Sequence, residues 1–214
     1  MNIEDFNIND FDNIEDLEKL LEDDGDKAED DFDGYKSGFV AIVGRPNVGK
    51  STFLNRVVGQ KVAIMSDKAQ TTRNKIQAVY TTDEAQIVFI DTPGIHKPHN
   101  ELGEFMNKSA YQSLEEVDAI LMLVNAEEPI GPGDKFVFEK IKNYKTRKFL
   151  GVNKIDKVSP EALADFMQTI PSPESFDGII PLSALNGNNV ETLIDTLVGL
   201  LPTGPQYYPS EFIT

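Results

Sequence analysis

Cysteine is missing from the 214-residue sequence, and histidine occurs only twice. Without cysteine, the chain cannot form a disulfide bond, a cysteine-ligated zinc site or a thiol nucleophile. Two histidines also cannot supply a His-rich metal cluster. No run approaches the roughly 18 consecutive apolar residues of a membrane-spanning helix, and the first residues are acidic where a secretory signal would be basic and then apolar. We therefore expect a cytoplasmic location.

Positive charge is scarce. The sequence has 20 Lys and Arg against 36 Asp and Glu, a net charge of −16, which argues against free-standing binding to nucleic acid or anionic membranes. Residues 1–34 hold 15 of the acids and two of the bases, so the rest is almost neutral at −3. We expect residues 1–35 to be an acidic, mostly disordered and solubilising extension. Ile14, Leu17, Leu20 and Leu21 have helical spacing, so a short amphipathic helix is the alternative.

The remaining chain alternates between strand and helix patterns. Apolar runs predict buried strands at 38–43, 118–126, 147–154 and 178–184, and 75–82 with 86–91 predicts a hairpin. Helical patterns occupy 51–58, 102–117, 134–144, 161–170 and 189–201. This alternation predicts an α/β domain over 36–203, with three α/β/α layers, a mostly parallel sheet and one antiparallel edge strand. The Pro-rich residues 204–214 are predicted to be a linker.

A phosphate-binding loop lies between the first predicted strand and helix. Its residues match GxxxxGK[ST], in the strand–loop–helix context that this motif requires. Successive backbone N–H groups and the helix N-terminus would bind the α- and β-phosphates, Lys50 would reach the β- and γ-phosphates, and Ser51 would bind Mg²⁺. The predicted site comprises Gly44, Arg45, Pro46, Asn47, Val48, Gly49, Lys50, Ser51 and Thr52.

Two further segments match the parts of a nucleotide-dependent switch. Asp91 ends a predicted strand, where it would hold Mg²⁺ through water, and the Gly94 N–H would bond the γ-phosphate. Thr92, Pro93 and Ile95 complete this predicted nucleotide-contacting segment. In the polar loop 66–73, Thr72, or alternatively Thr71, would bind Mg²⁺ and the γ-phosphate. The predicted metal ligands are therefore Ser51, Thr72 and, through water, Asp91.

The identity of the nucleotide base is predicted from residues that follow two later strands. Asp156 in Asn153-Lys154-Ile155-Asp156 can accept hydrogen bonds from N1–H and the 2-amino group of guanine, a pair that adenine lacks. Asn153 would brace the purine and the phosphate loop, and the stem of Lys154 would lie over the base. The segment Ser183-Ala184-Leu185 would direct a backbone N–H at guanine O6. The substrate is therefore predicted to be GTP.

With all four motifs in order, the sequence resembles the translation-factor-related GTPases and, within them, the Era family of bacterial ribosome-assembly GTPases. The resemblance covers roughly residues 36–214 and makes the domain a phosphate-loop G domain. The segments DKAQTTRNKI and GIHKP favour Era over the tandem-domain assembly GTPases and tRNA-modification GTPases, which share the phosphate loop and DTPG. Those relatives remain an alternative.

The Era resemblance implies a GTP-hydrolysing switch in small ribosomal subunit assembly and 16S rRNA maturation. It also implies a monomer, with peripheral membrane association as a further property of the family. Era proteins bind rRNA through a C-terminal KH domain, and no basic GxxG loop of that type occurs here. We therefore expect the KH domain to be absent, with 204–214 leading toward it.

The expected hydrolysis is slow, because Ile95 stands where Ras-type enzymes have a water-orienting Gln. Lys50, Thr72, Gly94 and Asn47 are the candidate catalytic residues. The resemblance implies assistance from Mg²⁺ and a monovalent cation, and Asn47 either coordinates K⁺ or only stabilises the loop. A GTP-responsive module with negligible hydrolysis is one rival. A phosphate-loop kinase of a small metabolite is another, opposed by the guanine motifs.

Two arginines and the two histidines are first interpreted without a catalytic role. The side chains of Arg45 and Arg73 are predicted to be solvent-facing loop charges, with an arginine-finger role for Arg73 as the alternative. His96 and His99 lie in the predicted second switch and are assigned no catalytic function.

Overall fold

The computed structural model describes residues 34–60, 75–91, 114 and 117–208. The acidic extension up to residue 33, most of the predicted helix at 102–117, and the segment 209–214 lie outside these residues. The described elements are β1 (Lys36–Val43), α2 (Lys50–Gln60), β2 (Lys75–Thr81), β3 (Ala85–Asp91), β4 (Ala119–Asn125), α4 (Pro132–Ile141), β5 (Arg147–Asn153), α5 (Pro160–Gln168), β6 (Gly178–Pro181) and α6 (Val190–Leu200), with short 3₁₀ turns at Ile155–Lys157 and Pro173–Ser175.

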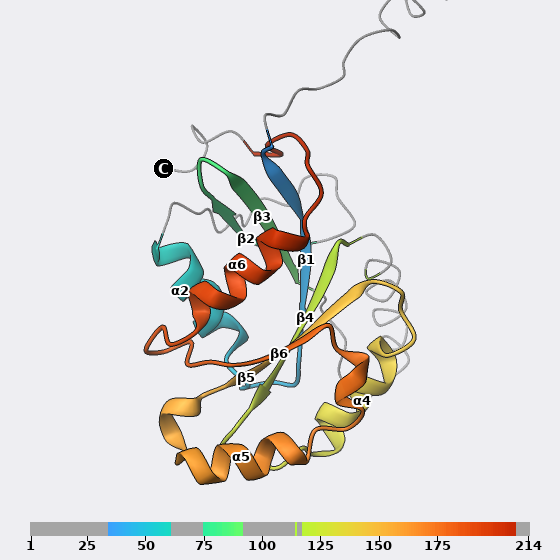
Figure 1. The fold of residues 1–214 in the computed structure, drawn as a ribbon, viewed down its shortest axis with the longest axis vertical. Coiled ribbons are helices and arrows are strands. Elements are labelled where there is room, and N and C mark those ends of the chain that lie inside the picture. The colour runs from blue at the N-terminus through green and yellow to red at the C-terminus, as the bar shows by residue number, and fades with distance from the viewer. Residues whose placement is uncertain (1–33, 61–74, 92–113, 115–116, 209–214) are drawn as a thin grey trace, which may run out of the picture. The chain divides into compact units, whose positions relative to one another are not determined.

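The strands of the described residues form one six-stranded sheet in the order β2-β3-β1-β4-β5-β6 (Figure 1). Strands β3, β1, β4, β5 and β6 run parallel to one another, whereas β2 pairs with β3 in the antiparallel direction. The hairpin therefore places the antiparallel strand at the sheet edge, as predicted. The predicted fold class is confirmed.

Hydrophobic side chains fill both faces of the sheet, because successive strand residues point to opposite sides. In β1, Ala41 and Val43 belong to a cluster that includes residues of α4 and α5. Val40 and Ile42 belong to a second cluster, which includes residues of α2 and α6. All seven residues of β4 are buried, which explains its continuous apolar run. The three layers follow from this pattern.

The described part of the predicted linker packs against the sheet. The Gly204 N–H donates to the Tyr35 carbonyl (3.0 Å), and the rings of Phe39 and Tyr207 lie 4.8 Å apart. The buried side-chain amide of Gln86 donates to the Tyr208 carbonyl (2.9 Å) and accepts from its N–H (3.0 Å). Residues 204–208 are therefore held on the domain. Among the described helices, none is long and apolar enough to cross a membrane.

Candidate functional site

The predicted nucleotide motifs lie at one edge of the sheet, beyond the carboxyl ends of parallel strands. The phosphate loop follows β1, Asn153 ends β5, and Ser183 to Leu185 follow β6. Asp91 ends β3 and pairs in register with Ile42 of β1, which places its backbone beside the strand that enters the phosphate loop. Ligands of open α/β sheets bind at this edge. The fold therefore brings together motifs that are more than 100 residues apart.

The phosphate loop has three left-handed backbone positions. Gly44, Asn47 and Gly49 have φ angles of 148°, 66° and 103°. A Cβ on Gly44 would lie 2.6 Å from the Leu123 carbonyl oxygen, so this position accepts only glycine without a backbone shift. Asn47 adopts its left-handed conformation with an exposed side chain. The loop thus turns sharply before α2 begins at Lys50.

Lys50 lies on the inner side of this loop. Its Nζ donates to the carbonyl oxygens of Gly44 (2.6 Å) and Arg45 (2.9 Å). These bonds hold the ammonium group at the N-terminus of α2, where the helix dipole also favours an anion. The arrangement is suited to a phosphate group.

Asn153 joins the phosphate loop to the segment that follows β6. Its Nδ2 donates to the Val48 carbonyl (2.9 Å), and its Oδ1 accepts from the Ala184 N–H (2.9 Å). The side chain is almost fully buried, at 2% exposed. A Cβ on Gly49 would clash with Asn153 Nδ2, so glycine is required there. One buried amide therefore sets the spacing of the predicted phosphate and base sites.

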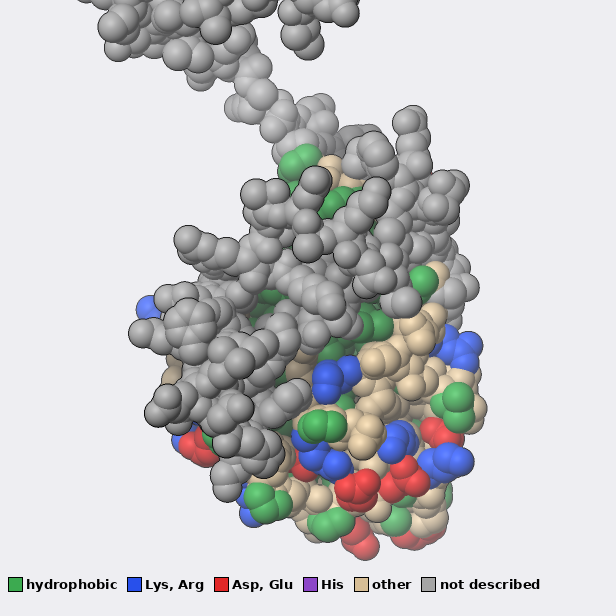
Figure 2. Space-filling view, turned by 180° about the vertical axis from the view of Figure 1, so that it is seen from behind, with side chains coloured by type: hydrophobic (Ala, Val, Ile, Leu, Met, Phe, Trp, Pro, Cys, Tyr) green, Lys and Arg blue, Asp and Glu red, His purple; other side chains and the backbone are tan. Residues whose placement is uncertain are grey.

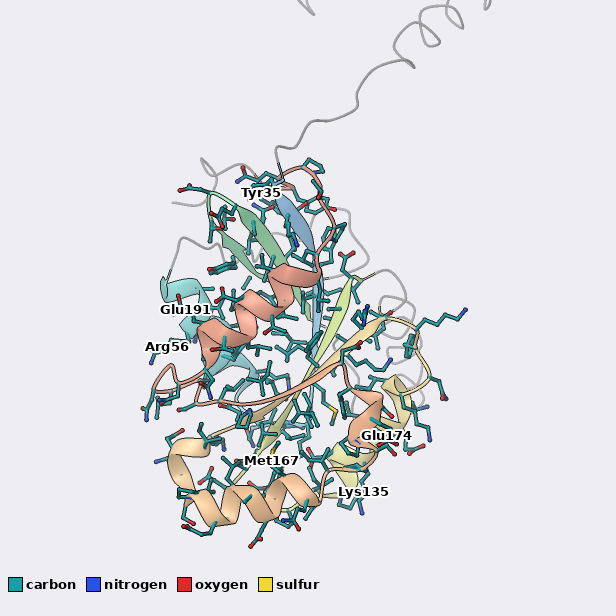
Figure 3. The ribbon with its side chains drawn as sticks, in the orientation of Figure 1. Tyr35, Arg56, Lys135, Met167, Glu174 and Glu191 are labelled. Atoms are coloured by element: carbon teal, nitrogen blue, oxygen red, sulfur yellow. The ribbon has the colours of Figure 1, made fainter. Side chains whose placement is uncertain are left out.

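Asp156 and the Ser183 segment form the predicted base site. The Ser183 hydroxyl donates to Asp156 Oδ1 (2.5 Å) and accepts from the Asn186 N–H (3.1 Å). Asp156 is exposed, and its carboxylate is held through Oδ1. Arg56 of α2, labelled in Figure 3, donates to the carbonyls of Ala184 (3.2 Å) and Leu185. The Ala184 N–H already donates to Asn153, so a bond to guanine O6 would share this donor.

Arg45 corrects the sequence analysis. Its side chain does not face solvent as a free loop charge: Nε lies 3.1 Å from both carboxylate oxygens of Asp134, and Nη2 lies 2.6 Å from Glu128 Oε2. Lys154 is also paired, through Nζ, with Glu127 (3.1 Å). Arg45 and Lys154 thus both contact carboxylates from the segment that follows β4.

The donors predicted for Mg²⁺ are consistent with that ion. Ser51 lies in the first turn of α2 and is exposed, and the backbone of Asp91 ends the strand beside β1. A hydroxyl and a carboxylate are the hard oxygen donors that Mg²⁺ takes from a protein when phosphates and water complete its shell. Among the described residues, no group of three or more His, Cys, Asp or Glu forms a separate metal cluster. Thr71, Thr72, Arg73, Thr92, Pro93, Gly94, Ile95, His96 and His99 lie outside the described residues.

Comparison with known proteins shows the protein family of this chain. Residues 39–154, more than half of the chain, match the family described as 50S ribosome-binding GTPase. The chain belongs to this GTPase family. GTPase Era of Alkaliphilus metalliredigens (strain QYMF) is 57% identical over 180 residues, which cover 84% of this chain and 61% of that protein. The chain thus spans about 61% of the length of this curated relative.

Two solved structures of Era are also similar. One is Era in complex with MgGDPNP and nucleotides 1506–1542 of 16S ribosomal RNA, with 42% identity, a TM-score of 0.69, and coverage of 83% of this chain and 61% of that chain. The other is an Aquifex aeolicus Era variant bound to GDP·AlF₄⁻, with 42% identity, a TM-score of 0.69 and coverage of 84% and 62%. The predicted resemblance to Era is confirmed, and the domain is an Era-type G domain.

The carboxylates that contact the motifs of this G domain were missed by the sequence analysis. Asp134 was read as the start of a helix, and Glu127 and Glu128 were not considered. The segment Gly131-Pro132-Gly133-Asp134 does predict a helix N-terminus. No sequence pattern pairs its carboxylate with an arginine 89 residues earlier, because that contact depends on β1 and β4 being neighbours.

Proposed function

We propose that the chain binds GTP and GDP with Mg²⁺ and hydrolyses GTP to GDP and phosphate. The observation that supports this most directly is Asn153, whose amide bonds the phosphate loop at Val48 and the base-site segment at Ala184. The two halves of a guanine nucleotide site are thereby held as one unit. The complexes of similar Era proteins with MgGDPNP and GDP·AlF₄⁻ support the same proposal.

On the phosphate side, the chain supplies fixed positive charge. Lys50 is held by two loop carbonyls, so its ammonium group need not reorganise when charge develops on the transferred phosphoryl group. Ser51 and Asp91 would hold Mg²⁺, which when bound neutralises charge on the β- and γ-phosphates. Water attacks the γ-phosphorus, and the bond to the β-phosphate oxygen breaks, leaving GDP and phosphate. Thr72 and Gly94 are proposed to position the γ-phosphate.

On the base side, Asp156 is proposed to select guanine. A carboxylate has about four acceptor positions. The Ser183 hydroxyl uses one of them and leaves enough for guanine N1–H and the 2-amino group. An adenine base would present no such donor pair and would leave those acceptor positions of the carboxylate without a base donor, which disfavours ATP.

The base assignment is tested by Asp156→Asn. The amide of the variant can donate to the C2 oxygen of xanthine, so we expect preference to shift from GTP toward xanthosine triphosphate. Competition of both nucleotides against a fluorescent GDP analogue measures the shift. Asp165→Asn, an exposed Asp-to-Asn change on α5, is the matched control. Unchanged GTP selectivity in Asp156→Asn would overturn the guanine assignment.

Slow hydrolysis is proposed because Ile95 replaces the water-orienting Gln of Ras-type enzymes. Single-turnover release of phosphate from bound GTP measures the rate directly. Release within minutes to hours is the expected result. No release over many hours, with GTP still bound, would favour the GTP-responsive module over the enzyme.

We further propose a role in small ribosomal subunit assembly and 16S rRNA maturation. Support comes from the similarity to an Era structure that contains 16S rRNA nucleotides. On the part of the surface that Figure 2 colours by side-chain type, basic and acidic side chains are interspersed rather than gathered into one basic patch. Co-sedimentation of the GDPNP-bound and GDP-bound chain with small subunits tests the role. Equal absence from the pellet in both states would count against subunit binding by this chain.

A further inference from the structure

A buried carboxylate lies beside the phosphate loop but outside the nucleotide motifs. Asp134, in the first turn of α4, is 2% exposed. It receives the Arg45 Nε at 3.1 Å on both of its oxygens and the Gly131 N–H at 3.0 Å. A buried carboxylate depends on such partners, because their loss leaves an uncompensated charge. The pair with Arg45 therefore strongly restricts where the loop can lie.

Arg45 transmits this restriction through its own backbone. Its guanidinium is held by Asp134 and by Glu128, while its carbonyl oxygen accepts from Lys50 Nζ. A Cβ placed on Gly133 would lie 3.6 Å from the Cβ and Cδ of Arg45, so the stem of this side chain also packs against the start of α4. A displaced Arg45 would therefore displace one of the carbonyl acceptors of Lys50, the lysine proposed to bind the phosphates.

The same segment contacts the base side of the site. Glu127 is paired with Lys154 at 3.1 Å. Asn125, at the end of β4, holds this segment by accepting from the Glu127 N–H (3.0 Å) and donating to Glu128 Oε1 (3.0 Å). These contacts are more exposed than the pair of Arg45 and Asp134, since Glu127 is 39% and Glu128 is 55% exposed. Asp134 is therefore the principal anchor.

We infer that Asp134 is a positioning residue for the phosphate loop and acts through the Arg45 guanidinium. The inference rests on the proposed guanine nucleotide site for its functional consequence. Without the buried charge, Arg45 loses its fixed partner and the loop samples more conformations before a phosphate binds. Nucleotide binding must then also order the loop, and the free-energy cost of that ordering lowers the affinity.

A purely structural role for Asp134 predicts a different outcome. Its bond to the Gly131 N–H caps α4, and loss of a cap lowers stability without reaching the phosphate loop. Two measurements distinguish these roles: hydrogen exchange of the phosphate loop, and the energetic coupling between Asp134 and Arg45 in GDP binding.

The first experiment needs no ligand. Amide hydrogen exchange of the peptide that spans residues 44–51 is compared in nucleotide-free wild type, Asp134→Asn and Asp177→Asn. Asp177 is the matched control, because it also accepts from an arginine (Arg147, 2.6 Å) and a backbone N–H (Lys148, 2.8 Å), but at the opposite end of β5. We expect exchange in the loop to rise at least threefold in Asp134→Asn alone. Equal exchange in both variants would overturn the inference.

The second experiment measures GDP dissociation constants at 25 °C for Asp134→Asn, Arg45→Gln and the double variant. Each single change is expected to weaken GDP binding about tenfold, and the double variant should be no weaker than the weaker single variant. Guanine-over-xanthine selectivity should not change. If the losses of affinity of the two single variants multiply in the double variant, or if Asp134→Asn keeps wild-type affinity, Asp134 acts only on α4.

A variant with an exposed carboxylate keeps the inference testable if Asp134→Asn does not fold. Glu128→Gln removes the negative charge of the other partner of the Arg45 guanidinium. It should raise loop exchange and weaken GDP binding about twofold, and added to Arg45→Gln it should cause no further loss. Loop exchange that stays unchanged in both Glu128→Gln and Arg45→Gln would refute the inference. If wild type itself fails to bind GDP, the proposed function fails, whereas the exchange result still decides whether Asp134 positions the loop.

Discussion

Substitution of Asn153 by alanine should affect both stability and nucleotide binding. The change removes the acceptor of the Ala184 N–H and the donor to the Val48 carbonyl, and both bonds are buried. An unpaired buried polar group costs about 1–3 kcal/mol. With two such groups left unpaired, we expect the free energy of unfolding to fall by about 2–6 kcal/mol. For a chain of this size, the melting temperature should fall by about 4–24 °C.

The effect of Asn153→Ala on affinity follows from the same two bonds. Each one holds a different half of the site, and a hydrogen bond contributes about 0.5–1.5 kcal/mol net. Loss of about 1–3 kcal/mol of preorganisation corresponds to GDP binding weaker by about 5- to 140-fold, at about 1.4 kcal/mol per tenfold. Titration with a fluorescent GDP analogue, well below the melting temperature of the variant, measures this change.

Gln86→Ala is the matched control for this prediction. Gln86 is also a buried amide that donates to one backbone carbonyl and accepts from one backbone N–H, both of Tyr208. It lies near the start of β3, at the opposite end of the sheet from the nucleotide motifs. A comparable loss of stability with unchanged GDP affinity is expected. If both variants bind GDP equally well, or lose affinity equally, the bridging role of Asn153 is refuted.

Three further outcomes follow from the structure. Gly49→Ala places a Cβ against Asn153 Nδ2 at a φ of 103°, so GDP binding should weaken more than tenfold in the same titration, and full affinity would contradict the loop geometry. Partial burial alone would raise the pKa of Asp177, but hydrogen bonds from the Lys148 N–H and the neighbouring guanidinium outweigh it and leave the pKa below its ordinary value of 3.8. The carboxylate therefore adds stability above pH 3.8 that is lost as the pH falls through its lowered pKa; acid unfolding of Asp177→Asn should depend less steeply on pH in that range, and an identical pH profile would contradict this. If Asn47 coordinates K⁺, GTP turnover in KCl should exceed that in equimolar NaCl, and Asn47→Ala should abolish the difference; equal turnover of wild type in both salts would exclude the cation role.

Most of the fold could be predicted because its signals are local. The fully buried strands β4 and β5 appear in the sequence as continuous apolar runs, and the short interval between β2 and β3 predicts a hairpin. The start of α5 was also predictable, because Pro160 follows the N-cap Ser159. The start of α4 was placed two residues late, at 134 instead of Pro132. Proline and glycine are common both in turns and at helix starts, so the sequence of this segment does not separate the two.

The segment after α6 shows the limit of composition. The prolines of residues 204–214, and the absence of a helical or strand pattern of apolar residues there, predicted an extended linker. In the described part, Gly204 and Tyr208 hydrogen bond to Tyr35 and Gln86. These partners lie more than 120 residues away in the sequence, so local pattern could not reveal them. A chain without repeating structure of its own can still be held by polar groups of the sheet.

The sequence alone determined the class of this protein and most of its binding motifs. Phosphate-loop glycines, a lysine at a helix start and a guanine-type Asp motif each depend on neighbours within a few residues. Tertiary structure decided which groups hold the motifs in place. The order β3-β1-β4-β5-β6 brings Asn153 to Val48 and Arg45 to Asp134. These contacts exist because parallel strands end at a common edge, a relation between segments that local spacing in the chain does not encode.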